Sequence, residues 1–195
     1  MRKYSFPNPK VMDNYEVISF DLFDTLISRS VNQPHQIFLD NGKLFWFLRR
    51  GAEFLARKMR ILSKQEISIS DIYKLLPFWD PKDEYILEMK HTVIVPEGYV
   101  AFKSAQILKK QIYIVSDMYL PSTFLETLLI HHNFPKPYTL IVSNEYGKSK
   151  TQGLFNDIYP VGKRASILHL GDNYYSDYCA PTHLGITAIH ILVSN

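Results

Sequence analysis

The stretch VISFDLFDTL, residues 17–26, decides the fold of this chain because it joins a strand pattern directly to a carboxylate. Residues 17–20 form a short apolar run of the kind found in buried strands of parallel sheets. Asp21 follows that run at once. Ligands of open α/β sheets bind beyond the carboxyl ends of the strands, so we expect Asp21 to lie at a functional site.

Similar apolar runs recur further along the chain, at residues 112–115, 140–142, 167–170 and 186–192. Each predicts a buried parallel strand. Helical patterns lie between the later runs, for example at residues 121–131, where a proline in the first turn precedes apolar residues. Strands that alternate with helices predict an α/β fold with right-handed crossovers and an open parallel sheet covered by helices on both faces.

Residues 27–96 break this rhythm, because they contain helical patterns and no convincing run of alternating strand residues. One apolar stripe recurs at spacings of three and four: Leu44, Leu48, Ala52, Leu55 and Met59. The spacing of Arg49, Glu53 and Arg57 favours an exposed, ion-paired helix face. A second helix is expected after the capping-box pair Ser68 and Asp71, and a third over residues 81–92. We therefore predict a helical insertion, residues 27–96, in a core domain of residues 1–26 and 97–195.

Polar residues follow each of the first four expected strands. They are Asp21, then Ser116 and Asp117, then Ser143 and Asn144, and finally Gly171, Asp172 and Asn173. These strand ends converge on one rim of the sheet. Asp21 and Asp172 would repel each other there unless a hard cation lay between them, and Mg²⁺ takes one or two carboxylates together with substrate phosphate and water. The pattern predicts a divalent metal.

A lysine near the same rim would supply the positive charge that a phosphate needs. Lys150 stands at the start of a helical pattern that leads into the fourth strand, and Lys148 is its competitor for this role. With the two carboxylates and a lysine, the set is complete for phosphoryl transfer.

Four segments resemble, in order, the four motifs of the haloacid dehalogenase (HAD) superfamily. They are VISFDLFDTL, IYIVSD, KSKTQGLF and LHLGDNYYSD, and together they span the chain from about residue 16 to 192. The resemblance implies a HAD-like Rossmannoid sheet with a helical cap inserted after the first strand. It also implies that residues 27–96 form this cap, which closes over small substrates and excludes water.

The resemblance further implies a covalent mechanism in which Asp21 attacks phosphorus and forms an aspartyl-phosphate that water then opens. Magnesium would be held by the carboxylates of Asp21 and Asp172 and by the backbone carbonyl of Phe23. Ser116 and Lys150 would hold the phosphoryl oxygens.

Three further residues are candidates for this site. Asp177 would orient Lys150 or a metal-bound water. Asp117 and Arg29 are candidates for binding the substrate together with Ser116 and Lys150, although a surface salt bridge is an equally good interpretation of Arg29.

Phe23 departs from the phosphatase pattern. Phosphatases of this superfamily normally carry a second aspartate two residues after the nucleophile, as general acid and then base. Asp24 is one residue too late, because a shift by one in an extended segment turns the side chain to the other face. Whether Asp24 or Asp117 replaces the missing acid is left open by the sequence.

Three functions are compatible with this pattern. The first is a Mg²⁺-dependent phosphohydrolase acting on a small phosphomonoester. The second is a phosphate-binding domain of low turnover that serves as an accessory module, with Phe23 as its signature. The third is a dehalogenase, since dehalogenases of the superfamily also have an aromatic residue at this position; they do without the metal, however, so Asp172 argues against it.

Finer features resemble a subgroup of bacterial HAD hydrolases found beside or fused to glycosyltransferases of surface-polysaccharide synthesis. The segments concerned are FDLFDTLISR, RRGAEFLAR, SDMYLP and the SK…GLF run of residues 149–155. This resemblance implies a sugar-phosphate or nucleotide-like substrate and an association with a glycosyltransferase.

Composition excludes several other classes of function. The chain has 195 residues, 46% of them hydrophobic, which suits one sizeable core. Its formal net charge is +3, and the basic residues are spread along the chain, so nucleic acid is not indicated as a partner. No apolar run approaches the roughly 20 residues that span a bilayer. The single cysteine, Cys179, indicates a reducing compartment, and we expect a cytoplasmic protein with a small phosphorylated substrate.

Overall fold

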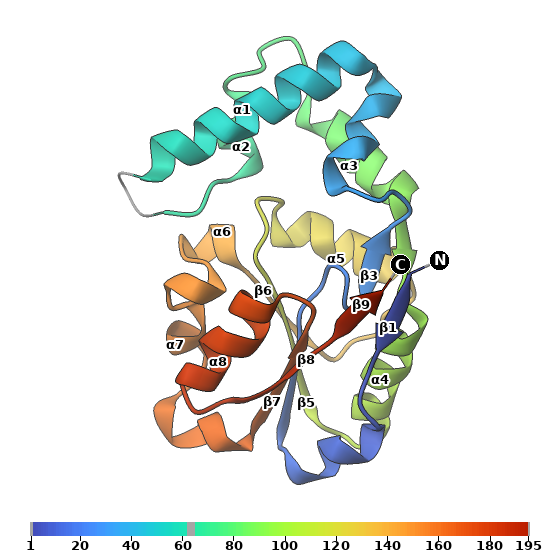
Figure 1. The fold of residues 1–195 in the computed structure, drawn as a ribbon, viewed down its shortest axis with the longest axis vertical. Helices are drawn as coiled ribbons and strands as arrows, with labels where there is room; N and C mark the ends of the chain where they lie inside the picture. The colour runs from blue at the N-terminus through green and yellow to red at the C-terminus, as the bar shows by residue number, and fades with distance from the viewer. Residues whose placement is uncertain (1, 62–64, 195) are drawn as a thin grey trace.

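A computed structural model describes residues 2–61 and 65–194 and shows an α/β fold built on one parallel sheet (Figure 1). The strands lie in the order β6-β5-β2-β7-β8. They are β2 (Val17–Phe20), β5 (Gln111–Ser116), β6 (Thr139–Val142), β7 (Ile167–Gly171) and β8 (Thr187–His190). The chain proceeds from β2 through β5 to β6 on one side and returns to β7 and β8 on the other. The order therefore reverses beside β2, and the carboxyl end of this strand lies at the switch point.

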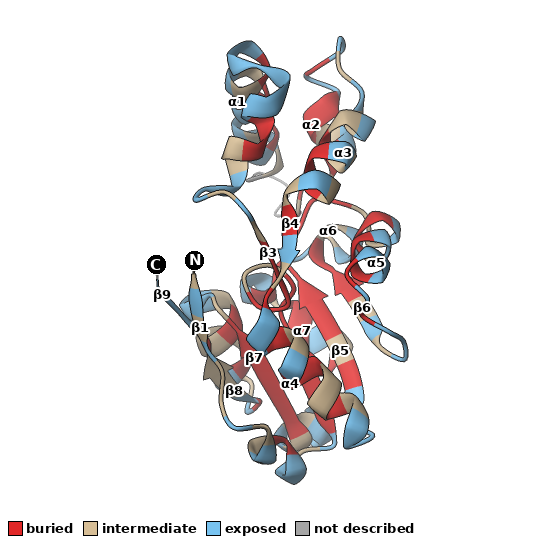
Figure 2. Cartoon of the chain, turned by 90° about the vertical axis from the view of Figure 1, so that its right-hand side faces the viewer, coloured by how far each residue is buried: buried red, intermediate tan, exposed pale blue. Residues whose placement is uncertain are grey.

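Helices cover both faces of the sheet, as predicted. They are α4 (Pro96–Ile107), α5 (Ser122–His131), α6 (Ser143–Tyr146), α7 (Leu154–Ile158) and α8 (Ala180–His183). Side chains alternate along β2, so that Ile18 packs in one core cluster with Phe102 of α4. Val17 packs in the other cluster with Phe155 of α7. This period of two buries the central strands on both faces, as the red strands in Figure 2 show.

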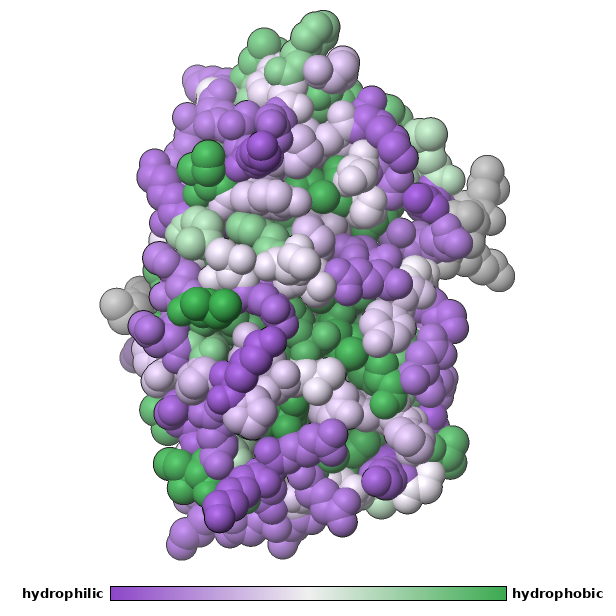
Figure 3. Space-filling model, turned by 180° about the vertical axis from the view of Figure 1, so that it is seen from behind, coloured by the Kyte–Doolittle hydropathy of each residue, from purple (hydrophilic) through white to green (hydrophobic). Residues whose placement is uncertain are grey.

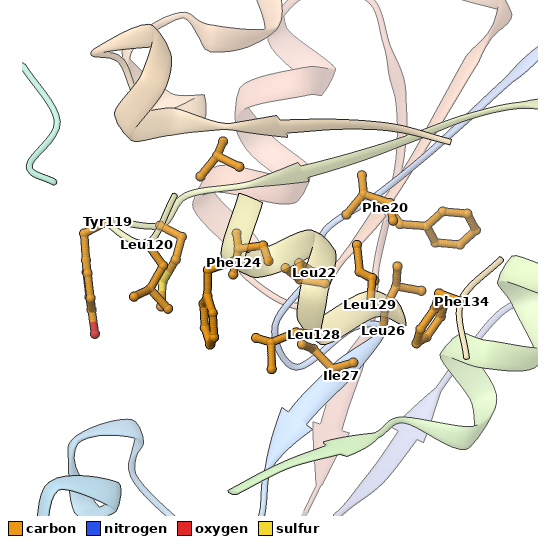
Figure 4. Close-up of a cluster of buried hydrophobic side chains, with 14 of the residues drawn as sticks. Phe20, Leu22, Leu26, Ile27, Tyr119, Leu120, Phe124, Leu128, Leu129 and Phe134 are labelled. Atoms are coloured by element: carbon orange, nitrogen blue, oxygen red, sulfur yellow. The ribbon is translucent and has the colours of Figure 1, made fainter. Parts of the chain in front are cut away.

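The segment after Asp21 is anchored in the larger of these clusters (Figure 4). Leu22 and Leu26 are completely buried, and the backbone N–H of Leu26 donates to the carbonyl of Leu22 at 2.9 Å. The first turn of α4 packs against the same segment, because a Cβ at Gly98 would lie 2.0 Å from the carbonyl oxygen of Thr25. Only glycine fits there, and the backbone that carries Asp21 is fixed from both sides.

Three predicted helices are present between residues 27 and 96, and in Figure 1 they lie above one end of the sheet. They are α1 (Lys43–Ile61), α2 (Ile69–Tyr73) and α3 (Pro81–His91), with a 3-10 segment η2 (Pro34–Asn41) before them. The capping box before α2 is confirmed, since the N–H of Asp71 donates to Ser68 Oγ at 3.3 Å and the N–H of Ser68 donates back to Asp71 Oδ2 at 3.0 Å. The shorter helical segments elsewhere are η1 (Pro9–Asn14), η3 (Lys150–Gln152), η4 (Val161–Ser166) and η5 (Tyr174–Cys179).

The expectation that residues 27–96 contain no strands is wrong. Strand β3 (Ile27–Arg29) pairs antiparallel with β4 (Thr92–Ile94), so the two ends of the insertion run side by side as a two-stranded neck. Each strand has three residues. Such strands are too short to show an alternating pattern in the sequence.

The buried face of α1 also differs from the predicted stripe. Ala52 is buried, but Leu44, Leu55 and Met59 are 67%, 53% and 68% exposed. Arg49 is completely buried, so its predicted place on an exposed helix face is wrong. Its guanidinium lies inside the insertion because Glu84 of α3 neutralises it there, with Nε donating to Oε2 at 2.6 Å.

The last predicted strand, residues 186–192, is divided in two. Strand β8 ends at His190, and β9 (Leu192–Ser194) pairs antiparallel with β1 (Lys3–Ser5) in a separate small sheet. Between the two strands, the N–H of Ile191 donates to the carbonyl of Gly171 at 2.7 Å, and the side chain of Ile191 is completely buried. These contacts fix the residue at which the chain leaves the parallel sheet.

On the face drawn in Figure 3, hydrophilic side chains predominate at the lower end, and hydrophobic patches are scattered among hydrophilic side chains over the rest. Among the helices of residues 2–61 and 65–194, none is both long enough and apolar enough to cross a bilayer.

Candidate active site

Most of the residues singled out in the sequence line one cavity of about 590 Å³, but Ser143 and Asn144, which follow the third strand, do not. The cavity is bounded by the carboxyl ends of β2, β5 and β7 and by the insertion. The predicted site residues that line it are Asp21, Phe23, Arg29, Ser116, Asp117, Lys150, Asp172 and Asp177. The fold thus brings together side chains from four separate segments of the sequence.

Lys150 is the buried cation of this site. Its Nζ donates to Asp21 Oδ1 and to Asp177 Oδ1, both at 2.5 Å. Burial alone would lower the pKa of Lys150, but the charges of Asp177 and Asp21 outweigh burial and raise this pKa above its ordinary value. The ammonium group therefore stays charged. Lys148 forms an ion pair with Asp157 at 2.8 Å instead, so Lys150 rather than Lys148 contacts Asp21.

Asp177 is held by contacts from several sides. Besides Lys150, its carboxylate accepts the N–H of Asn173 at 3.0 Å and lies 3.2 Å from His169 Nε2. Burial would raise the pKa of Asp177, but Lys150 and His169 lower it below its ordinary value, so the carboxylate is ionised. Asp177 thus contacts Lys150 as an ionised group, and that it orients Lys150 stays a prediction.

His169 is a component of the site that the sequence analysis missed. It is completely buried on β7, and its Nδ1 lies 2.7 Å from Ser19 Oγ of β2. The network is satisfied if Ser19 Oγ–H donates to Nδ1 and Nε2–H donates to Asp177. A histidine within the apolar run of residues 167–170 was the available signal.

Gly171 permits the close approach of Asp177 to β7. A Cβ at this position would lie 2.5 Å from both Cβ and Cγ of Asp177. Any other residue would therefore push the carboxylate away from Lys150, which explains a glycine directly before Asp172 in structural terms.

Asp172 differs from its neighbours because no cation among the described residues pairs with its carboxylate. Burial, followed by the negative charges of Asp177 and Asp24, raises the pKa of Asp172 to about 6. Burial and the charges of Asp177 and Asp172 likewise raise the pKa of Asp21, against the effect of Lys150. Carboxylate oxygens of Asp21, Asp172 and Asp177 lie within 4.8 Å of one another. This hard-oxygen donor set with excess negative charge fits a divalent cation such as Mg²⁺.

Ser116 and Asp117 follow β5 into the cavity. Ser116 is 2% exposed and lines the cavity. Asp117 Oδ1 accepts the backbone N–H of Lys150 at 2.9 Å. Asp117 thereby fixes the segment that carries Lys150, a contact that its position in the sequence did not indicate.

Phe23 and Arg29 are in contact at the neck of the insertion. The Arg29 guanidinium carbon lies 4.1 Å from the centroid of the Phe23 ring. Arg29 also pairs with the buried Glu88 of α3, with Nη2 donating at 2.7 Å and Nε at 2.9 Å. The geometry places Arg29 on the cavity wall and directs two of its nitrogen atoms to Glu88.

Asp24, the other candidate acid, is engaged with its own neighbours. It adopts a left-handed backbone conformation with a φ of 55°. Its Oδ1 accepts from Arg2 Nη1 at 2.6 Å and from Ser28 Oγ at 2.5 Å. These contacts direct one carboxylate oxygen towards the amino-terminal segment and the neck.

The sequence matches no family model and has no significant match among curated proteins. Solved structures do match. The L-2-haloacid dehalogenase RSc1362 aligns with a TM-score of 0.63 and 15% identity over 91% of this chain and 86% of its own. The HAD family enzyme BT-2542 from Bacteroides thetaiotaomicron aligns with a TM-score of 0.61 and 12% identity over 91% of this chain and 93% of its own.

Two further structures widen this comparison. BT-2542 in complex with magnesium and inorganic phosphate aligns with a TM-score of 0.57 and 14% identity over 90% of this chain and 93% of its own. A HAD phosphatase from Thermococcus onnurineus has a TM-score of 0.55 and 13% identity over 90% of this chain and 85% of its own. The sheet order, the flanking helices and these likenesses agree, and the chain has the HAD-like Rossmannoid fold.

Proposed function

We propose that this chain is a Mg²⁺-dependent phosphohydrolase that cleaves a small phosphomonoester through an aspartyl-phosphate at Asp21. One observation carries the proposal. The carboxylate of Asp21 lies at the switch point of the sheet, in contact with Lys150 and close to Asp172, which has no ion-pair partner in the described part of the chain; the site lies inside a cavity of about 590 Å³. A cavity of this size suits a small ligand.

In the proposed reaction, Asp21 attacks phosphorus through Oδ2, because Lys150 holds Oδ1. The bond from phosphorus to the substrate oxygen breaks, and that oxygen leaves with the electron pair. Ser116 and the ammonium group of Lys150 hold the non-bridging oxygens, where negative charge increases in the transition state. Water then attacks the same phosphorus atom, which releases phosphate and restores the carboxylate.

The residues present would also hold Mg²⁺. Its ligands would be the carboxylates of Asp21 and Asp172 and the backbone carbonyl of Phe23, while Asp177 remains engaged with Lys150. The ion would neutralise charge on the phosphoryl oxygens.

The insertion would serve as a cap over this centre. It contributes one wall of the cavity, including His35, Phe38 and Phe54. A wall of this kind excludes water and leaves substrate selection to the insertion, because the rim of the sheet supplies only the general phosphate chemistry.

Phe23 favours a second candidate, a phosphate-binding module of low turnover that acts beside a glycosyltransferase. No carboxylic acid occupies the position two residues after Asp21, and Arg29 lies over the ring that does. A leaving alkoxide would then depart without a proton from this position.

The deciding experiment is a screen of the purified chain against a panel of phosphomonoesters, with and without Mg²⁺. Hydrolysis that requires Mg²⁺ supports the leading proposal, with Asp21→Asn as the control that must be inactive. Binding of phosphate without hydrolysis of any ester supports the second candidate. A chloride-release assay with a 2-haloacid completes the screen, and turnover there would contradict both.

A further inference from the structure

Three arginines line the insertion side of the cavity, and two of them have an acidic partner. Arg29 pairs with Glu88, and Arg57 pairs with Glu53. Arg50 also lines the cavity, and no carboxylate within residues 2–61 and 65–194 forms an ion pair with it. The wall therefore has one positive charge, on Arg50, with which no carboxylate of the described residues forms an ion pair.

The side chain of Arg50 is held in place without an acid. Its guanidinium carbon lies 4.6 Å from the centroid of the Trp46 ring, a cation–π contact between residues one helical turn apart. His35 packs on the same ring, with centroids 5.8 Å apart. The guanidinium carries its N–H donors in a planar fork that matches a carboxylate or a phosphate group.

The charge of Arg50 also acts on its surroundings. Partial burial and the charge of Arg50 lower the pKa of His35, so the imidazole is neutral at neutral pH and offers a hydrogen bond instead of a second charge. Apolar side chains, Phe38 and Phe54, line the cavity beside these polar groups. The wall thus presents a cation, a neutral hydrogen-bonding ring and an aromatic surface to whatever fills the cavity.

We propose that the leaving part of the substrate carries a second anionic group, a carboxylate or a phosphate, that Arg50 binds. This inference rests on the proposed function, because it assumes that the reacting phosphoryl group lies at Asp21. Two anionic ends would then be held at opposite parts of one molecule, the first by Lys150 and Ser116 and the second by the fork of Arg50. The substrate class is a small phosphorylated acid rather than a neutral alcohol phosphate.

The test uses non-hydrolysable probes, titrated calorimetrically into the full chain in the presence of Mg²⁺. Phosphonoacetate, phosphonopropionate and phosphonobutyrate carry a second acid at increasing distances, and methylene diphosphonate and propylene diphosphonate carry a second phosphonate. Methyl-, ethyl- and propylphosphonate are the matched probes without it. A charged hydrogen-bonded pair predicts that at least one two-acid probe binds about tenfold or more tightly than its matched alkylphosphonate.

Variants assign that preference to one residue. Arg50→Gln should remove the preference while the affinity for alkylphosphonates stays unchanged. Lys58→Gln is the matched control, because Lys58 is exposed on the same helix and does not line the cavity, and it should keep the preference. Whether the carboxylate or the phosphonate series shows the larger gain distinguishes the two kinds of acid.

Two results would overturn the inference alone: equal binding of both probe classes by the wild type, or a preference that survives Arg50→Gln. Failure of every probe to bind, together with no hydrolysis in the phosphomonoester screen, would overturn the proposed function itself. Thermal melting of Arg50→Gln should match the wild type, since the side chain is exposed and has no ion pair to lose among the described residues.

Discussion

The molecule contains two buried charged networks, one around Lys150 and one around Arg49, and they differ in what they leave unsatisfied. Arg49 donates to Glu84 through Nε and Nη2 and to Glu53 through Nη1, and the hydroxyl of Tyr119 donates to Glu84 at 2.7 Å. Lys150 is equally well paired, but its partner Asp21 faces the cavity, and no cation of the described residues pairs with Asp172 beside it.

This difference distinguishes buried charges that stabilise the fold from buried charges that can bind a ligand and react with it. A network whose donors and acceptors are all matched stabilises one arrangement and has no capacity left for a ligand. A network with surplus negative charge and a carboxylate oxygen that faces the cavity is completed only by a cation and a substrate. We call the Arg49 network closed and the Lys150 network open. The following predictions test this division, from the largest expected effect to the smallest.

Asp21→Asn should abolish the proposed reaction of the open network and leave the fold intact. The amide keeps the shape of the side chain but cannot attack phosphorus, so turnover should fall by at least about 10³-fold. Steady-state hydrolysis and the thermal melting curve measure the two effects separately. Retained hydrolysis in this variant would show that the nucleophile is elsewhere.

Arg49→Met should destabilise the fold, because it removes the only arginine that pairs with Glu84 in the closed network of the described residues. The substitution leaves Glu84 buried without its cation, which should lower the free energy of unfolding by about 3–5 kcal/mol. Urea denaturation measures this change. Arg57→Gln is the matched control, since Arg57 is 50% exposed and its ion pair should contribute less than about 1 kcal/mol. Equal stability of Arg49→Met and wild type would show that the pair is not needed for the fold.

Asp172→Asn removes the surplus negative charge of the open network and should therefore stabilise the fold in the absence of a metal ion. The pKa of Asp172 in the fold is about 6, above the roughly 3.9 of an unfolded aspartate. Its ionised form is therefore disfavoured by folding, so this group lowers stability above pH 6 and ceases to do so as the pH falls towards 4. Without Mg²⁺, Asp172→Asn should raise the free energy of unfolding at pH 7 by about 1–3 kcal/mol.

The same variant tests the metal site. Because the neutral amide is a poorer ligand, Asp172→Asn should lose the stabilisation that Mg²⁺ gives the wild type. In the wild type, Mg²⁺ affinity should fall as the pH drops through about 6, when Asp172 takes up a proton. A variant that still responds to Mg²⁺ would place the ion elsewhere.

Phe23→Asp changes a position on the cavity wall that lies under the guanidinium of Arg29. In the wild type, rates across a series of aryl phosphates should fall steeply as the leaving-group pKa rises, because position 23 supplies no proton. A general acid contributes roughly 10²- to 10⁴-fold, but Arg29 would favour the ionised form of a carboxyl there. We therefore expect a gain of about tenfold on alkyl phosphates and a flatter dependence.

The outcome that contradicts this expectation is a wild type already fast on alkyl phosphates with a flat dependence. Asp24 and Asp117 would then be the acids to substitute. Both have a structural contact to lose, Asp24 with Arg2 and Asp117 with the N–H of Lys150, so thermal melting must accompany their kinetics.

The sheet and the convergence of polar residues on its rim could be predicted from the sequence because both follow from local patterns. A buried strand shows as an apolar run, and the residue after it lies at the rim whatever the rest of the chain does. Asp21, Ser116 and Asp172 needed no further information.

The insertion was harder to predict because its pairings are distant. Arg49 and Glu84 are 35 residues apart, and nothing at either position marks the other. An arginine in a helix is exposed in most proteins, so the sequence favoured the wrong face of α1. His169 was missed for the same reason, since its partners Ser19 and Asp177 come from other elements.

The glycine at position 171 has a genetic consequence. Every missense change of a glycine codon adds at least a β-carbon, and here that atom would lie 2.5 Å from the side chain of Asp177. In a saturation-mutagenesis library, this codon should tolerate only synonymous changes when the library is selected for activity. The codon of Gly51 should tolerate many substitutions, because a β-carbon there would meet no atom within 4 Å. The frequencies of the surviving codons at positions 171 and 51 would thus measure how strictly activity depends on the close approach of Asp177 to β7.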